Sequence, residues 1–140
     1  MYKFITYSLM MLFIFTVQAQ INLPAGSSAA SVTTTVGLTE VSISYFRPKM
    51  KGRKIFGIDG SALLEYGVMW RTGANSGTTV TLSTPAKIGG TEVPAGTYLI
   101  ITTPGDDQFD FMLYGDPSIG SNFSKMKSDQ ILVNMKVDNL

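Results

Sequence analysis

Residues 78–103 read TTVTLSTPAKIGGTEVPAGTYLIITT, and this stretch decides the fold. Threonines alternate with Val80 and Leu82 in its first part, as polar and apolar side chains do along a half-buried β-strand. Gly89-Gly90 stands between two short runs, and adjacent glycines favour the positive φ angles of a two-residue hairpin turn. The stretch therefore predicts four short strands joined by tight turns, at Thr78–Ser83, Ala86–Ile88, Thr91–Val93 and Thr97–Thr103.

The same pattern continues on both sides of this stretch. Val41, Ile43 and Tyr45 fall on one face of a period-two run, and Gly37-Leu38 predicts a turn before that run. Pro104–Asp107 predicts a later reversal, because Pro, Gly and Asp are turn residues. The other predicted strands are Val32–Val36, Val41–Phe46, Val68–Thr72, Phe109–Tyr114 and Ile131–Val137.

Many short strands with turn residues between them predict an all-β fold, an antiparallel β-sandwich of about seven to nine short strands. A small closed β-barrel is the alternative. Only Ser61–Tyr66 has the composition of a short helix, because its Ala-Leu-Leu run favours helix and Asp59 offers a cap. We therefore expect at most one short helix.

The N-terminus has the parts of a secretory signal peptide. Lys3 gives a positive start, Phe4–Val17 is an apolar run of fourteen residues, and Val17-Gln18-Ala19 offers compact residues for cleavage. The apolar run is shorter than the roughly 20 residues that span a bilayer, so we expect no stable membrane span after cleavage. The expected division is a signal peptide at 1–19, a flexible leader at 20–30 and a single β-sandwich domain at 31–140.

Composition restricts where the protein works and what it can do. The signal peptide predicts an exported protein, periplasmic or extracellular. The absence of cysteine predicts that it is not a lipoprotein and needs no disulfide. It also has no histidine, which excludes Ser-His-Asp triads, zinc fingers and axial-histidine haem sites. Ten basic and ten acidic residues remain after loss of Lys3, so we expect no nucleic-acid partner. We expect no cofactor.

Half of the basic residues of the mature chain lie in residues 47–54, namely Arg47, Lys49, Lys51, Arg53 and Lys54. Pro48 has no amide hydrogen to give to a sheet and Gly52 permits a bend, so we expect a shaped loop after a strand. Guanidinium and ammonium groups bind phosphate, sulfate and carboxylate. Arg47, Lys51 and Arg53 are therefore candidate ligand-binding residues. The alternative is a solvated loop in which Arg47 pairs with Glu65.

A second cluster follows at residues 70–75, Trp-Arg-Thr-Gly-Ala-Asn. A tryptophan beside arginine and asparagine is typical of sites that hold a sugar or an aromatic ligand by stacking and directed hydrogen bonds. Trp70, Arg71 and Asn75 therefore join the candidate ligand-binding residues. The alternative is that Trp70 is a core residue and Asn75 a turn former.

Acidic residues gather at Asp106, Asp107 and Asp110, with Asp116 beyond. Oxygen ligands of this kind can hold Ca²⁺. Asp and Gly are also ordinary turn residues, and the spacing does not match the EF-hand pattern. A polar hairpin is the favoured interpretation, and we expect no metal site.

Several of these segments resemble a known family. The motifs are Tyr45–Pro48, Lys51–Gly57, Tyr66-Gly67, Trp70–Asn75, Pro94–Tyr98 and Thr103–Gly105. In this order they are similar to the exported Bacteroidota domain of unknown function numbered twenty-nine eleven, from about Ser31 to Val137. The resemblance implies a mainly β domain of the cell envelope and brings no established activity. Ser76 stands where such proteins often have Glu, which weakens any proposal for a catalytic acid there.

Relatives in this family usually continue through further strands, so we expect that the chain is truncated at Leu140 or that its last strand is an exposed edge. Ile131–Val137 would then be a site for strand addition by a partner.

Three functions fit the sequence. The first is a non-enzymatic binding module for an anionic or carbohydrate-like ligand, with no catalytic residues. The second is a hydrolase or lyase that acts on envelope polysaccharide without histidine, with Tyr45 or Tyr66 as the acid or base. The third is a structural or assembly component of the envelope. The first is the interpretation that the clustered cations favour.

Overall fold

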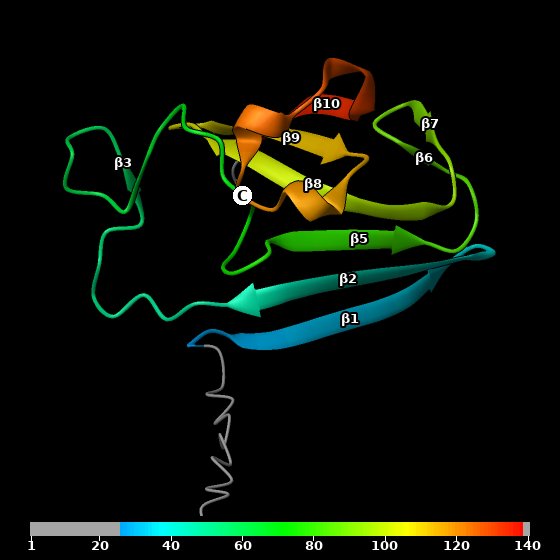
Figure 1. Cartoon of the computed structure of the whole chain (residues 1–140), viewed down its shortest axis with the longest axis horizontal. Coiled ribbons are helices and arrows are strands. Elements are labelled where there is room, and N and C mark those ends of the chain that lie inside the picture. Colours follow the sequence, from blue (N-terminus) through cyan, green and yellow to red (C-terminus); the bar gives the residue numbers. More distant parts are fainter. Residues whose placement is uncertain (1–25, 139–140) are drawn as a thin grey trace, which may run out of the picture.

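The computed structural model describes residues 26–138, so the predicted signal peptide and residues 20–25 of the predicted leader lie outside the described residues. Figure 1 shows a single large sheet, with a small hairpin beside one end and a long loop beside the other. The sheet has the strand order β1-β2-β5-β8-β9-β10, and all of its pairings are antiparallel. Its strands are β1 (Ser28–Val36), β2 (Thr39–Arg47), β5 (Thr78–Leu82), β8 (Gly96–Pro104), β9 (Gln108–Tyr114) and β10 (Ile131–Asp138).

The remaining elements are short. Two strands in the long loop, β3 (Phe56–Gly57) and β4 (Leu64–Glu65), pair in parallel, and the hairpin of β6 (Ala86–Ile88) and β7 (Thr91–Val93) turns at Gly89-Gly90 as predicted. Three 3₁₀ turns precede the last strand, η1 (Pro117–Ile119), η2 (Phe123–Lys125) and η3 (Ser128–Gln130). The prediction of an all-β antiparallel sandwich is confirmed, and no closed barrel forms within residues 26–138.

The burial of strand β8 on both faces explains why residues 98–101 form a continuous apolar run. Tyr98 and Ile100 face one side of the sheet and Leu99 and Ile101 face the other. A strand covered on both faces has no solvent side and therefore loses its polar alternation. Leu99 and Ile101 are 0% and 1% exposed, so β8 is the centre of both apolar layers.

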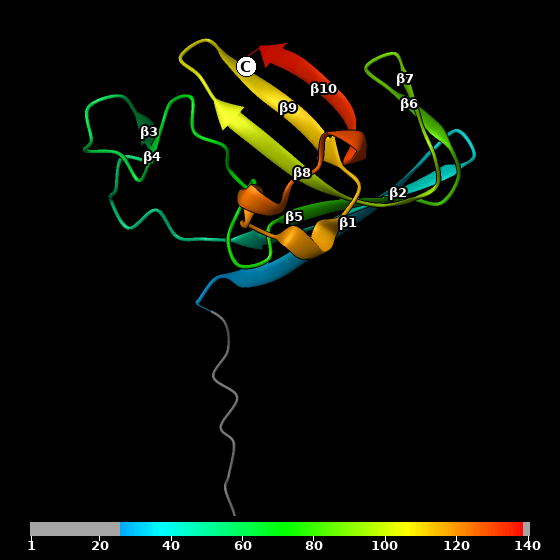
Figure 2. The same ribbon diagram turned by 45° about the horizontal axis from the view of Figure 1, so that its top comes forward.

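Different elements cover the two faces. On the first face, Val93 of the β6–β7 hairpin packs with Leu82, Leu113 and Val133 from three strands of the sheet. The hairpin is thus a small second layer, and Figure 2 shows it at the opposite end of the sheet from the loop that carries β3 and β4. On the second face, Ile119 of η1 packs with Leu99, Ile101 and Tyr114.

The candidate helix at Ser61–Tyr66 does not form, which is consistent with the expectation of at most one short helix. Leu63 and Leu64 donate their backbone amides to the carbonyls of Lys54 and Ile55, each at 2.9 Å, so the segment runs extended beside β3. Because one to two helical turns are marginal without packing, pairing with a distant segment overrides the local preference.

The predicted strand at Val68–Thr72 is reduced to one bridge. The Trp70 amide donates to the Thr102 carbonyl at 2.7 Å, and the Thr102 amide donates back at 2.9 Å. Thr72 then takes a φ of 54°, which no strand accommodates. The chain therefore forms a single bridge with β8 and then turns away.

The two edges of the sheet are β1 and β10. β10 carries Lys136 and a register shift between Ile131 and Val133, and both features discourage the addition of another strand. β1 begins at Ser28, inside the segment expected to be leader, and pairs with β2 without a bulge. Within residues 26–138, no helix is long and apolar enough to cross a membrane.

Replacing Leu99, which is 0% exposed, by alanine should lower the free energy of unfolding by about 2–5 kcal/mol, because it leaves a cavity in the central strand. Leu38→Ala is the matched control, since Leu38 is 96% exposed and should change stability by less than about 0.5 kcal/mol. Urea denaturation measures both. Equal effects of the two substitutions would contradict the placement of the core.

Candidate functional site

A cavity of about 450 Å³ lies between the loop that follows β2 and the loop that precedes β5. The two cationic segments singled out in the sequence therefore meet on one surface. Three basic residues line the cavity, namely Lys49, Arg53 and Arg71. Its apolar walls include Met50, Ile55, Phe56, Leu63, Leu64 and Trp70.

The first loop is shaped by its own arginine. Arg53 donates from Nε to the Met50 carbonyl and from Nη2 to the Lys49 carbonyl, each at 2.9 Å. The bend between them takes positive φ at Lys51 and Gly52. Arg53 therefore holds the loop closed and has only part of its guanidinium left for a ligand.

The second loop is pinned at Trp70. Besides the two backbone bonds to Thr102, the Trp70 Nε1 donates to the Gly73 carbonyl at 3.1 Å. Thr72 has a φ of 54° and accepts a hydrogen bond on its carbonyl from the Thr78 hydroxyl. A positive φ at a β-branched residue is rare and strained, and such strain is often found at functional sites. These contacts fix the backbone on both sides of Arg71.

An aromatic cluster forms the wall beside Trp70. The rings of Phe56 and Trp70 meet edge to face at 5.5 Å, and those of Phe56 and Phe109 at 5.7 Å. Trp70 is half-buried and belongs to this cluster, not to either main core layer. It therefore offers part of its ring to the cavity.

The charge in the cavity has one sign. None of the side chains that line it within the described residues is a carboxylate. The Nε of Arg71 is buried and has no hydrogen-bond partner. Buried polar groups normally have partners, so an unpartnered guanidinium nitrogen beside a cavity calls for a specific explanation.

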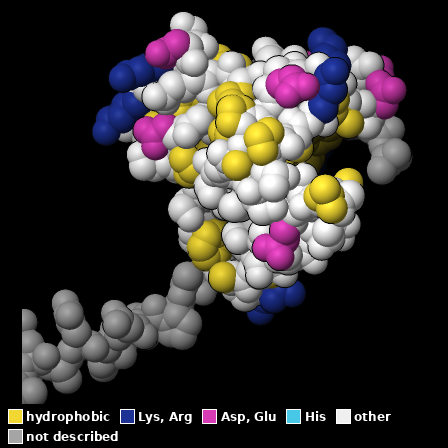
Figure 3. Space-filling view, turned by 90° about the vertical axis from the view of Figure 1, so that its right-hand side faces the viewer, with side chains coloured by type: hydrophobic (Ala, Val, Ile, Leu, Met, Phe, Trp, Pro, Cys, Tyr) yellow, Lys and Arg dark blue, Asp and Glu magenta, His cyan; other side chains and the backbone are white. Residues whose placement is uncertain are grey.

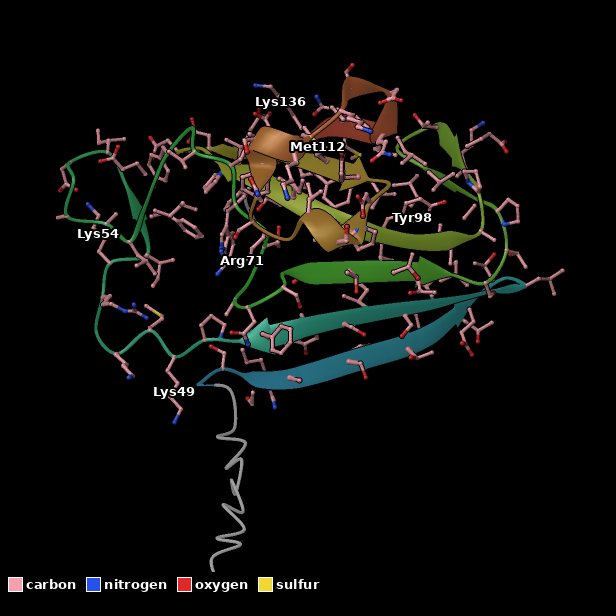
Figure 4. The ribbon with its side chains drawn as sticks, viewed as in Figure 1. Lys49, Lys54, Arg71, Tyr98, Met112 and Lys136 are labelled. Atoms are coloured by element: carbon pink, nitrogen blue, oxygen red, sulfur yellow. The ribbon has the colours of Figure 1, made fainter. Side chains whose placement is uncertain are left out.

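The structure separates the six candidate residues into two groups. Arg53, Trp70 and Arg71 line the cavity, whereas Arg47, Lys51 and Asn75 are exposed and do not line it. Figure 4 shows Arg71 facing the long loop from the sheet side, with Lys49 and Lys54 on the loop itself. Asn75 has a φ of 52°, as expected of a turn former.

The suggested ion pair between Arg47 and Glu65 is wrong. The ion pairs within residues 26–138 are Lys54–Asp59 at 3.2 Å and Lys136–Asp110 at 3.9 Å. Arg47 is the last residue of β2 and lies opposite Ser28, so the strand pairing sets its position.

Sequence reasoning missed the apolar half of the cavity. Leu63 and Leu64 lie in the segment that has the composition of a short helix. The available signal was the pair of adjacent apolar dipeptides, Ile55-Phe56 and Leu63-Leu64, with Gly, Asp and Ser residues between them. Such runs can form two short paired strands, which is what β3 and β4 are.

The other predicted chemistries lie away from this cavity. Tyr45 and Tyr66 do not line it. Asp106, Asp107 and Asp110 border a separate surface hollow with Lys136. Among residues 26–138, no three acidic side chains lie together in a way that could hold a metal ion.

Lys54 forms an ion pair with Asp59 outside the cavity. Asp59 accepts from the Ser61 hydroxyl at 2.6 Å and from the Ser61 amide at 3.2 Å, and it pairs with Lys54. The hydrogen bond from the Ser61 side chain, followed by that from Lys54, lowers the pKa of Asp59 from 3.8 to about 2.

Comparison with known proteins gives a family and no activity. A family model described as a protein of unknown function, DUF2911, matches residues 27–140. No curated protein matches the chain. No solved structure matches it. The matched range contains both loops of the cavity.

Gly77→Ala should destabilise the loop behind Arg71 more than Gly90→Ala does. Both glycines have positive φ, at 93° and 86°, but a Cβ at Gly77 would lie 2.9 Å from the Arg71 carbonyl and one at Gly90 would meet nothing within 4 Å. We expect a loss of about 1–2 kcal/mol for Gly90→Ala from backbone strain, and a larger loss for Gly77→Ala. Equal losses in thermal unfolding would show that the close approach does not exist.

Ser61→Ala should raise the pKa of Asp59 from about 2 toward 3.8, and by more than Lys54→Met does, because the serine hydroxyl is the larger cause. The pKa in the folded protein is lower than in the unfolded chain, so this carboxylate stabilises the fold above pH 3.8 and loses that contribution as the pH falls toward 2. A carboxyl ¹³C titration by NMR measures it. A pKa of 3.8 for Asp59 in the unchanged protein would contradict the contact.

Proposed function

We propose that this chain, which belongs to the DUF2911 family of proteins of unknown function, is a non-enzymatic binding module for a small anionic ligand. The ligand occupies the cavity between the loop after β2 and the loop before β5. The observation that carries the proposal is the buried, unpartnered Nε of Arg71 beside this cavity. An anion that contacts this guanidinium from the cavity would balance its charge and accept hydrogen bonds from it.

The energetics of Arg71 support a ligand. A buried donor without a partner costs about 1–3 kcal/mol, and more when the group is charged. A hydrogen bond from a charged donor contributes about 1.5–3 kcal/mol. An anion bound to this guanidinium would offset part of that cost.

The positive charges around Arg71 also favour an anionic ligand. Lys49 and Arg53 line the cavity beside Arg71 without any acidic neighbour in its walls. A hollow lined by one sign of charge concentrates counter-ions. Elsewhere charges are mixed: on the face that carries the β6–β7 hairpin, Figure 3 shows basic and acidic side chains interspersed.

The walls favour binding over catalysis. General acid–base chemistry needs a group that exchanges a proton near the working pH. The described walls have no carboxylate, hydroxyl or imidazole, and their polar side chains are Lys49, Arg53 and Arg71. A lysine and two arginines are cations that bind and hold an anion.

Export is the setting we propose for this module. The N-terminal residues 1–19 have the charge, apolar run and small residues of a signal peptide. These features support a periplasmic or extracellular domain of the cell envelope.

Arg71→Ala should weaken the binding of the anions that the parent protein takes up by about tenfold or more, because it removes the charge and the buried donor. Arg71→Lys should restore only part of the affinity, since it keeps the charge and loses the planar fork. Calorimetry measures the affinity of each protein for phosphate, sulfate, acetate, glucuronate and phenylacetate.

Arg47→Ala is the control, because Arg47 carries the same charge outside the cavity and should leave affinity nearly unchanged. Equal binding by the parent and Arg71→Ala proteins would refute the proposed site.

A further inference from the structure

We propose that the ligand of this cavity is a carboxylate with an apolar body, such as an aromatic or branched acyl acid, and not a sugar acid or a phosphate. This inference rests on the proposed function, which requires only that an anion bind beside Arg71. It adds the chemistry of the rest of the ligand. Three features of the cavity carry it: the balance of donors and acceptors, the nature of the walls, and the number of free donors.

The polar side chains in the walls can only donate hydrogen bonds. Lys49, Arg53 and Arg71 have no acceptor atoms. A carboxylate has only acceptors, so it complements them. Each hydroxyl of a sugar is also a donor and needs an acceptor of its own.

Seven of the backbone carbonyls in the cavity lining already accept hydrogen bonds. The carbonyls of Lys49 and Met50 accept from the Arg53 side chain, and that of Gly73 accepts from the Trp70 ring nitrogen. Carbonyls that accept from backbone amides are those of Ile55, Trp70, Arg71 and Ala74. Sugar hydroxyls that entered this cavity would lose water without gaining good acceptors, which opposes their binding.

The walls match an apolar body. Met50 and Leu63 line the cavity and are large apolar side chains left 60% and 59% exposed. Leu64 and the edge-to-face rings of Phe56 and Trp70 continue this surface. An aromatic or branched acyl group would remove these side chains from water, which is favourable in proportion to the apolar area covered.

The number of free donors favours a head group with two oxygens. Arg53 has committed its Nε and one Nη2 hydrogen to the loop. Arg71 lines the cavity and donates no side-chain hydrogen bond to the described residues, and the planar fork of an arginine matches the two oxygens of a carboxylate. A phosphate has no apolar part, so it would leave the apolar walls of the cavity exposed to water.

Trp70 allows a direct test, because it is the only tryptophan of the chain and lies in the cavity wall. Phenylacetate is titrated against three matched probes, each followed by tryptophan fluorescence and by calorimetry. Phenylacetamide keeps the aromatic group of phenylacetate but has no charge. Glucuronate has a carboxylate attached to a sugar ring. Inorganic phosphate is an anion with no apolar group. Phenylacetate should bind about tenfold or more tightly than each of them.

Two variants test whether the apolar wall of the cavity contributes to the affinity for phenylacetate. Leu63→Asn should weaken phenylacetate by about threefold to tenfold and leave phosphate unchanged, because Leu63 lines the cavity and is exposed enough to change without unfolding the protein. Leu38→Asn, at a 96% exposed leucine on the β1–β2 turn, should change neither.

The outcomes distinguish this inference from the proposed function. If glucuronate or phosphate binds more tightly than phenylacetate and depends on Arg71, the inference is overturned and the proposed function stands. If phenylacetamide binds as tightly as phenylacetate, or if no probe binds, both are overturned.

Discussion

The burial of strand β8 on both faces is the constraint on which the rest of the structure depends. Tyr98 and Ile100 belong to one apolar layer, and Leu99 and Ile101 to the other. Its neighbours β5 and β9 satisfy the backbone on both sides. Near its end, Thr102 forms the paired hydrogen bonds with Trp70. The loop that carries Arg71 is thus attached to the most deeply buried strand of the domain, which makes it a rigid support for a binding site.

Much of the fold could be predicted from local signals. Period-two alternation located the long strands, and Gly37-Leu38 and Gly89-Gly90 located two hairpin turns, because these preferences belong to the residues themselves. The candidate helix at 61–66 does not form and the predicted strand at 68–72 is reduced to one bridge, for a common reason. Their backbone partners lie at residues 54–57 and at Thr102, which no local pattern reveals.

The candidate site shows the same division. The sequence indicated that residues 47–54 and 70–75 carry cations, and Arg53 and Arg71 do line one cavity. It gave no means of seeing that Arg47 would end a strand and remain outside. It also gave no sign that the carbonyls of Lys49, Met50 and Gly73 would be taken by neighbouring donors. Because these carbonyls are engaged, the walls offer hydrogen-bond donors and apolar surface but few free acceptors. Such walls fit a ligand that has an anionic head and an apolar body.

The central claim is that the guanidinium of Arg71 binds an anion. The NMR signal of the hydrogen on its Nε tests this claim most directly. In the free protein, this hydrogen should exchange slowly with water because the atom is buried without a partner. On addition of phenylacetate, the Arg71 signal should shift downfield while that of Arg47 stays in place. An Arg71 signal that exchanges as fast as that of Arg47 and does not move with any anion would contradict the account.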